Sequence, residues 1–315
     1  MYTKILILIG LPLMIFAAEW QSLNGPPAGR ADDMSIGWDP LHGYYVIYAA
    51  DQTHKLYKST NEGEYWDSLP PEGHPNPYII NPTCVITNPD NAQVVYMGRN
   101  YSTPVYKSTN GGVDWEPKSA GITNENPRCF AMHPNSSSIL YLGCKTDACA
   151  AFRTTNGGTQ WYQKDMVASQ DDPTVNELAI NPGSPSDPDD HVLVAATDDG
   201  IYYTSNGGGN WSLKLDKSDM VSVSYANQSI VYAGRNASDE GLFKSTDGGS
   251  TWDTNPIESF SYVRAVAAVS PNEVYIAANT SSDGRGIYRT TNGGSNWSYY
   301  GRGDSLFCND SIIEI

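Results

Sequence analysis

Arginines and carboxylates recur in this sequence near the ends of short, apolar, strand-like segments. A guanidinium holds a carboxylate through two parallel hydrogen bonds, so several of them around one opening could bind a carboxylated sugar, a polysaccharide or an acidic peptide terminus. The residues predicted to bind such a ligand are Arg99, Arg128, Glu177, Asp199, Arg235, Arg264 and Arg285. Other polar residues at corresponding points are Asn176, Asp219, Asp239, Glu240 and Asp283.

The carboxylates near these strand ends could also take part in catalysis. Glycoside hydrolysis needs two acids at a defined separation, one to donate a proton and one to act as base or nucleophile. Glu177 with Asp33 or Asp219 is the candidate pair. Acids at strand ends are more often solvated or bound by arginine, so the sequence favours binding over catalysis and no catalytic residue is assigned.

A repeated turn motif identifies the elements that must position these residues. The pattern Ser/Thr-x-Asn/Asp-x-Gly-x-x-Trp occurs six times, and its tryptophans lie between 41 and 50 residues apart. A period of this length indicates a repeated supersecondary unit. The glycine permits positive φ, the Asn or Asp accepts from backbone amides, and the tryptophan buries apolar surface against its own unit. The positions given this structural role are Asn61, Trp66, Asn110, Trp115, Asn156, Trp161, Asn206, Trp211, Asp247, Trp252, Asn292 and Trp297.

Each period also contains four short strand signals separated by Gly, Pro and Asn turns. Four strands per period are typical of a propeller blade, and the chain after its N-terminal segment shows no sustained helical periodicity. We therefore predict an all-β protein, a β-propeller of four-stranded blades. Seven blades are expected, with six complete strand sets and a last blade left incomplete by truncation at the C-terminus. A six-bladed ring is the alternative.

The repeated turn resembles the Asp-box, also called the bacterial neuraminidase repeat or BNR, whose pattern is S-x-D-x-G-x-T-W. Asp247 keeps the aspartate of that pattern and Thr251 keeps the threonine, while the other five copies carry Asn in place of Asp. The resemblance covers nearly the whole chain after residue 18 and implies a β-propeller. It leaves function open, because sialidases, xyloglucanases, sortilin-type receptors and photosystem II assembly propellers all use this repeat.

The N-terminal segment predicts export. Residues 1–18 carry Lys4, an apolar run and Ala17-Ala18, which is the shape of a secretory signal peptide. Residues 19–315 are then a single propeller domain that is secreted, periplasmic or at the cell surface, and no second apolar segment predicts a membrane span. A net charge of −16 argues against nucleic acid as a partner.

Five cysteines are present, and Cys144 and Cys149 flank a predicted turn, which makes them the candidates for a disulfide. Cys84 and Cys129 occupy equivalent first-strand positions in neighbouring blades, and the sequence does not decide whether they meet.

The signals for metals are sparse. Asp187-Pro188-Asp189-Asp190 could hold calcium, but the run lacks the regular alternation of an EF-hand loop, so no metal and no cofactor is assigned. The five histidines, His133 and His191 among them, have no spacing typical of a metal site or a triad and are expected at the surface.

The sequence thus predicts an exported β-propeller that acts as a non-catalytic binding scaffold for a glycan or an extracellular protein, through the face around its central channel. The alternative is a glycoside hydrolase of the sialidase or xyloglucanase type. Convergent carboxylates in a deep cleft would favour the hydrolase, and an arginine-dominated mouth would favour binding.

Overall fold

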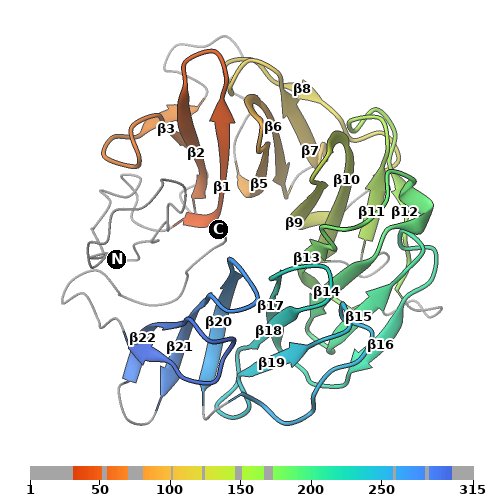
Figure 1. The fold of residues 1–315 in the computed structure, drawn as a ribbon. Helices are drawn as coiled ribbons and strands as arrows, with labels where there is room; N and C mark the ends of the chain where they lie inside the picture. Colours follow the sequence, from red (N-terminus) through yellow and green to blue (C-terminus); the bar gives the residue numbers. More distant parts are fainter. Residues whose placement is uncertain are drawn as a thin grey trace.

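The computed structural model describes residues 31–51, 55–69, 81–100, 102–122, 125–145, 151–166, 173–257, 260–280 and 284–299. These residues form six antiparallel sheets around a common centre, with one strand of each sheet facing that centre (Figure 1). The arrangement is the predicted β-propeller, and its six strand sets agree with the six that the repeats predict, five of them with four strands and one with three. Within the described ranges, no helix is long and apolar enough to cross a membrane.

Each sheet is one blade, and its strands follow the chain outward from the centre. The innermost strands of blades 1 to 6 are β1 (Ala31–Asp39), β5 (Pro82–Asn88), β9 (Asn126–His133), β13 (Val175–Ile180), β17 (Met220–Tyr225) and β20 (Ser261–Ala268). The second strands are β2 (Tyr44–Asp51), β6 (Asn91–Arg99), β10 (Ser136–Lys145), β14 (Leu193–Thr197), β18 (Val231–Arg235) and β21 (Val274–Thr280). Every residue of β14 is buried, because neighbouring blades cover both faces of this strand.

The outer strands are shorter. The third strands are β3 (Leu56–Ser59), β7 (Val105–Ser108), β11 (Ala151–Thr154), β15 (Ile201–Thr204), β19 (Leu242–Ser245) and β22 (Gly284–Thr290). The fourth strands are β4 (Asp67–Leu69), β8 (Glu116–Pro117), β12 (Tyr162–Gln163), β16 (Ser212–Leu215) and β23 (Ser298–Tyr299).

Blade 5 departs from the expected four strands, because its sheet contains only β17, β18 and β19. The next segment still lies along β19: the N–H of Asp253 donates to the Lys244 carbonyl (3.1 Å) and that of Ile257 to the Leu242 carbonyl (2.8 Å). Pro256 lies between these bonds and has no N–H to donate, which prevents a regular ladder.

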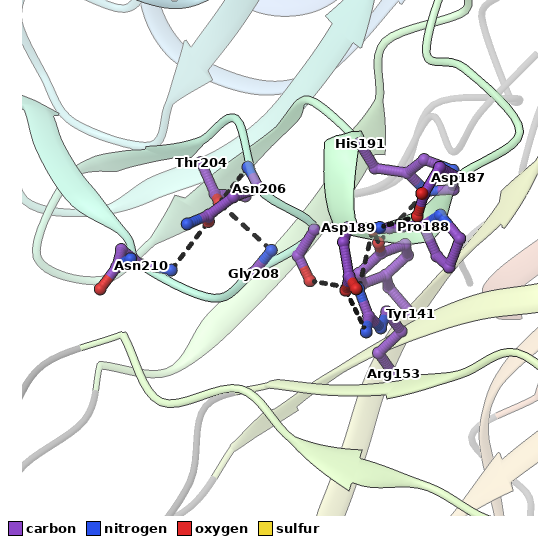
Figure 2. Close-up of polar contacts among 11 residues, drawn as sticks. Tyr141, Arg153, Asp187, Pro188, Asp189, His191, Thr204, Asn206, Gly208 and Asn210 are labelled. Atoms are coloured by element: carbon purple, nitrogen blue, oxygen red, sulfur yellow. Dashed lines mark hydrogen bonds and ion pairs between the residues drawn. The ribbon is translucent and has the colours of Figure 1, made fainter.

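The six repeated turns share one hydrogen-bond pattern, which Figure 2 shows for the fourth copy. Thr204 donates its hydroxyl hydrogen to Asn206 Oδ1 (2.8 Å) and accepts from the N–H of Gly208 (3.2 Å), and Asn206 Oδ1 also accepts from the N–H of Asn210 (2.8 Å). Gly208 has a φ of +82°, where a larger residue would be strained. The corresponding three bonds are present in the other five turns, as predicted from the residue types.

The tryptophans of these turns are held in different ways. The Nε1–H of Trp66, Trp115 and Trp252 donates to a glycine carbonyl of the same turn, at 2.9 to 3.1 Å. Trp161 has an exposed fraction of 1% and donates to the Lys118 carbonyl of the preceding blade (2.8 Å). The last two are only partly buried, and their Nε1 atoms make no hydrogen bond to any described residue: Trp211 and Trp297.

The hydrophobic core lies between neighbouring blades. One cluster, for example, joins Val194 and Ile201 of blade 4 to Val231 and Phe243 of blade 5. Side chains alternate between the two faces of each strand, so a blade in the middle of the series packs one apolar face against each neighbour. Whole blades, rather than single strands, are therefore the units that pack.

A polar contact, called here the latch, reinforces this packing. In blade 1, the Nζ of Lys58 lies 5.8 Å from the centroid of the Tyr48 ring and donates to the Gly111 carbonyl of blade 2 (3.1 Å). The Tyr48 hydroxyl donates to the Ala92 carbonyl, also in blade 2 (2.8 Å). Three further pairs of a basic residue and a tyrosine reach the next blade: Lys107 with Tyr96, Arg153 with Tyr141, and Lys244 with Tyr232.

Blade 6 carries the same pair but holds it within the blade. The guanidinium of Arg289 lies 5.5 Å from the centroid of the Tyr275 ring and donates from Nη2 to Glu273 Oε1 (2.7 Å). The Tyr275 hydroxyl donates to the same oxygen (2.8 Å). The position of Glu273 is apolar in every other blade: Val46, Val94, Ile139, Val192 and Ile230. In blade 6, Glu273 thus accepts hydrogen bonds from the tyrosine and the basic residue, whereas in the other latches a backbone carbonyl of the next blade accepts them.

Candidate ligand-binding site

Every innermost strand breaks its pairing with the second strand near its beginning. The break leaves one residue out of the register in β1, β5, β9, β13 and β17, and three residues, 262–264, in β20. In β1, Ala31 pairs with Asp51 and Asp33 pairs with Ala50, which leaves Asp32 between them, outside the register. Such a bulge redirects a side chain away from the ladder. The residues at this point, called here the bulge residues, are Asp32, Thr83, Arg128, Asn176, Val221 and Arg264.

The bulge residues lie near the beginnings of the strands that surround the centre of the ring, and all six are at least partly exposed. Some of them connect one blade to the next. Thr83 donates from Oγ1 to the Pro127 carbonyl (2.6 Å), and Asn176 donates from Nδ2 to the Met220 carbonyl (2.8 Å). Arg128 is exposed and lies 3.5 Å from Asn176 Oδ1 through its Nη2. Two predicted ligand-binding residues, Arg128 and Arg264, therefore belong to one set of equivalent positions.

The residue that follows each bulge residue is used differently, because it faces the neighbouring blade. Asp33 Oδ2 accepts from the N–H of Val85 (2.7 Å), and Glu177 Oε2 accepts from the N–H of Val223 (2.6 Å). Ser222 accepts in the same way from the N–H of Val266 (3.0 Å). Asp33 and Glu177, the carboxylates considered for catalysis, thus both accept backbone hydrogen bonds across blade seams.

Cys84 and Cys129 take the corresponding position in blades 2 and 3, each opposite a glycine. A Cβ on Gly98 would lie only 2.4 Å from Cys84 Sγ, so the glycine makes room for the thiol. Cys84 is a free thiol, and no disulfide joins it to Cys129; burial raises the pKa of Cys84 well above its usual value.

The predicted disulfide is a different pair. Cys144 is buried near the end of β10, and Cys149 lies outside the described residues, so the bond between them stays a prediction.

Arg99 and Arg235 are the last residues of the second strands β6 and β18, and their side chains contact neighbouring loops. Arg99 donates from Nε to the Thr103 carbonyl (2.9 Å), and its guanidinium packs 4.6 Å from the centroid of the Tyr106 ring. Arg235 donates from Nε to the Ser218 carbonyl (2.9 Å) and pairs with Asp239 (3.3 Å). Both arginines stabilise loops at this end of the blades, and neither is among the bulge residues.

The remaining candidates are dispersed. Asp199 is exposed in the turn between β14 and β15, where its N–H donates to Thr197 Oγ1 (3.2 Å). Arg285 is exposed near the start of β22. Asp219 is exposed before β17, and Glu240 pairs with Lys217. The last polar candidate lies outside the described residues: Asp283.

The structure adds Tyr262, a residue that no sequence signal identified. It has a φ of +50° and an exposed fraction of 39%, and it lies two residues before Arg264. Its N–H donates to the Ala237 carbonyl of blade 5 (2.6 Å). Positive φ is unusual for so bulky a residue, and such strain is concentrated at functional sites, which makes Tyr262 a further candidate.

The Asp187–Asp190 run, considered for calcium, is organised around a cation that the protein itself supplies. Pro188–Asp190 form a short 3-10 helix, η1, which is capped by Asp187. Arg153 of blade 3 donates to the Pro188 carbonyl (2.7 Å) and to Asp189 Oδ1 (2.7 Å), as Figure 2 shows. Among the described residues there is no cluster of His, Cys, Asp or Glu side chains that could hold a metal ion.

Comparisons with known proteins identify the fold. A scan against protein-family models and a search of curated proteins each find no match. Among solved structures, a GH74 enzyme from Niastella koreensis is similar over 90% of this chain and 50% of its own, with a TM-score of 0.66 and 16% identity. An ancestral GH74 enzyme is similar over 90% of this chain and 40% of its own, with a TM-score of 0.63 and 19% identity.

A second group of similar structures is closer to this chain in length. YCF48 bound to D1 peptide is similar over 83% of this chain and 78% of its own, with a TM-score of 0.57 and 17% identity. This chain spans half or less of the two GH74 enzymes. At such identities the likeness shows the β-propeller fold and leaves the activity open.

Proposed function

We propose that this protein is an exported β-propeller that binds a glycan or an extracellular protein without catalysis, through its bulge residues. One observation carries the proposal: the strand register breaks at the same end of every innermost strand, yet the break presents a different set of side chains around the ring, two of them arginines. A guanidinium recognises carboxylates, so the ligand class is an acidic glycan or an acidic peptide segment.

The position of the carboxylates supports binding over hydrolysis. A glycosidase needs a proton donor and a second acid that can reach the substrate. Asp33 and Glu177 instead accept from backbone amides of the next blade, and rotating either away would leave a backbone N–H without its acceptor. The similarity to YCF48 is compatible with a peptide ligand, because that propeller was solved with a D1 peptide.

The proposal includes membership of the Asp-box repeat proteins and export by residues 1–18. The six shared turns, with the same three hydrogen bonds in each copy, support the first part. The sequence pattern of the N-terminal segment supports the second part.

The first test combines binding and hydrolysis on the exported chain. Arrays of acidic glycans and acidic peptides would report binding, and mass detection of released sugar from sialosides and glucans would report hydrolysis. We expect a bound ligand, no sugar release, and loss of binding in Arg128→Ala and Arg264→Ala. Sugar release from the folded chain would instead identify a glycoside hydrolase.

The matched control is Lys214→Ala, which removes one positive charge from the outer strand β16 and leaves the bulge residues intact. Binding that falls equally in this variant would reflect overall charge and would contradict a site at the bulges.

A further inference from the structure

Two histidines that the sequence placed at the surface are buried instead, at the seam between blades 3 and 4. His133 ends β9 and His191 follows η1, with exposed fractions of 2% and 0%. Their rings stack with centroids 4.7 Å apart and 17° between the planes. Because β9 begins near Arg128 and ends at His133, the seam has a bulge contact at one end and this histidine pair at the other.

His191 contacts Tyr141 through Nδ1. This atom lies 3.2 Å from the Tyr141 hydroxyl, and the same hydroxyl donates to the Pro188 carbonyl (3.3 Å). The Nε2 of His191 is buried and makes no hydrogen bond to a described residue. A proton added there would be buried beside the ring of His133.

Both ring nitrogens of His133 contact the backbone. Its Nδ1 accepts from the N–H of Asn135 (3.2 Å), and its Nε2 lies 3.4 Å from the Ser184 carbonyl. The backbone of both blades thus holds the His133 ring in place against His191.

The charged groups around the pair come from several elements. Arg153 of β11 bonds to Pro188 and Asp189, and Lys164 lies beyond it. Burial and the His133 ring lower the pKa of His191, with a further contribution from Arg153, and together they outweigh the Pro185 carbonyl and Asp187, which raise it. Figure 2 shows His191 with Tyr141, Arg153 and the η1 residues.

We propose that this stacked pair makes the seam between blades 3 and 4 sensitive to acid: protonation of His191 at its buried Nε2 separates the rings and loosens the contact between the two blades. Above about pH 6.5, the ordinary value for histidine, both the closed and the opened states are neutral and the seam is intact. Below it, the opened state takes up a proton more readily, because its imidazole is solvated, and opening becomes more favourable as the pH falls.

Hydrogen–deuterium exchange of the full chain at pH 7.5 and pH 5.0 tests the proposal, after correction for the pH dependence of intrinsic exchange. Peptides covering β9, η1 and β14 should lose protection at pH 5.0, by at most about 30-fold for an opened-state pKa of about 6.5, while β18 and β19 keep theirs. Unchanged protection at the seam, or an equal loss in every blade, would overturn the proposal.

Variants identify the group that titrates. His191→Asn keeps a polar group near the position of Nδ1 but cannot be protonated. His133→Asn keeps an acceptor for the N–H of Asn135 but removes the ring that stacks on His191. Each should reduce the acid-induced loss, whereas His42→Asn, at the exposed turn between β1 and β2, should retain it. Should both seam variants fail to fold, an NMR titration of the wild-type imidazoles decides: His191 protonating at or above the ordinary histidine value contradicts the proposal.

Discussion

The two ends of each blade repeat in different ways. At the repeated turns, nearly the same residues make the same three hydrogen bonds in all six copies. At the bulges, the backbone irregularity recurs while the side chain changes from Asp to Thr, Arg, Asn or Val. The same residue types therefore recur at the turns, where their side chains hold the backbone in shape. At the bulges the backbone keeps its shape with different side chains, so the residue type there can change without changing the fold.

The largest expected effect lies at the turns. Trp161 is fully buried and bonds to the preceding blade, so Trp161→Ala should lower the free energy of unfolding by about 3–5 kcal/mol. Trp297 is only partly buried, so Trp297→Ala should lower the free energy of unfolding by less. Urea unfolding of both variants measures the difference. Equal losses would mean that the turns are interchangeable supports.

The second effect concerns the residue next to a bulge. Glu177→Ala removes a buried carboxylate that accepts from the N–H of Val223, and should cost about 1.5–3 kcal/mol in urea unfolding. Glu177→Gln keeps an acceptor and should cost less. The control Asp199→Ala, at an exposed turn, should change stability by less than about 0.5 kcal/mol. A Glu177→Gln variant of native stability that lost a hydrolytic activity would reassign this residue to catalysis.

A smaller effect, on the pH dependence of stability, is expected at the fifth turn. Asp247 is a carboxylate, whereas the other five turns have Asn at this position. Burial raises its pKa, but hydrogen bonds from Thr251 and Ser245 outweigh this and leave the pKa below 3.8. The ionised form therefore stabilises the fold above about pH 4, and this contribution is lost as the pH falls through the folded-state pKa.

Asp247→Asn should remove that acid dependence and leave stability at pH 7 within about 0.5 kcal/mol of the wild type. The thermal unfolding temperatures of the wild type and the Asp247→Asn variant, measured between pH 2.5 and pH 7, test this. Asn206→Asp is the reverse change and should add a weaker dependence, because Asn210 stands where Thr251 donates its hydroxyl hydrogen to Asp247 (2.6 Å). A dependence as large as that of Asp247 would show that the Thr251 hydroxyl contributes little.

The smallest effect on stability is expected at the bulges. Arg128 is exposed, and its one described hydrogen bond is long, so Arg128→Ala should stay within about 0.5 kcal/mol of the wild type in urea unfolding. A loss above about 1 kcal/mol would make Arg128 a structural residue and would weaken the contrast between the two ends.

The sequence predicted the turns well because their geometry depends on local hydrogen bonds within eight residues. The directions of Asp33 and Glu177 could not be predicted, because a one-residue bulge decides whether a side chain faces the centre or the next blade. The latches left a signal that was overlooked: a basic residue precedes the motif in five of the six copies, at Lys58, Lys107, Arg153, Lys244 and Arg289. The burial of His133 and His191 depends on contacts between blades and leaves no such pattern.

The latches also give the series a direction. In blades 1, 2, 3 and 5 the latch donates from one blade to a backbone carbonyl of the next, so these contacts all run in the same direction along the chain. In blade 6, Glu273 binds the donors of its own blade. The direction of the latches therefore changes at blade 6, where a carboxylate of the same blade takes the place of a backbone carbonyl across the seam.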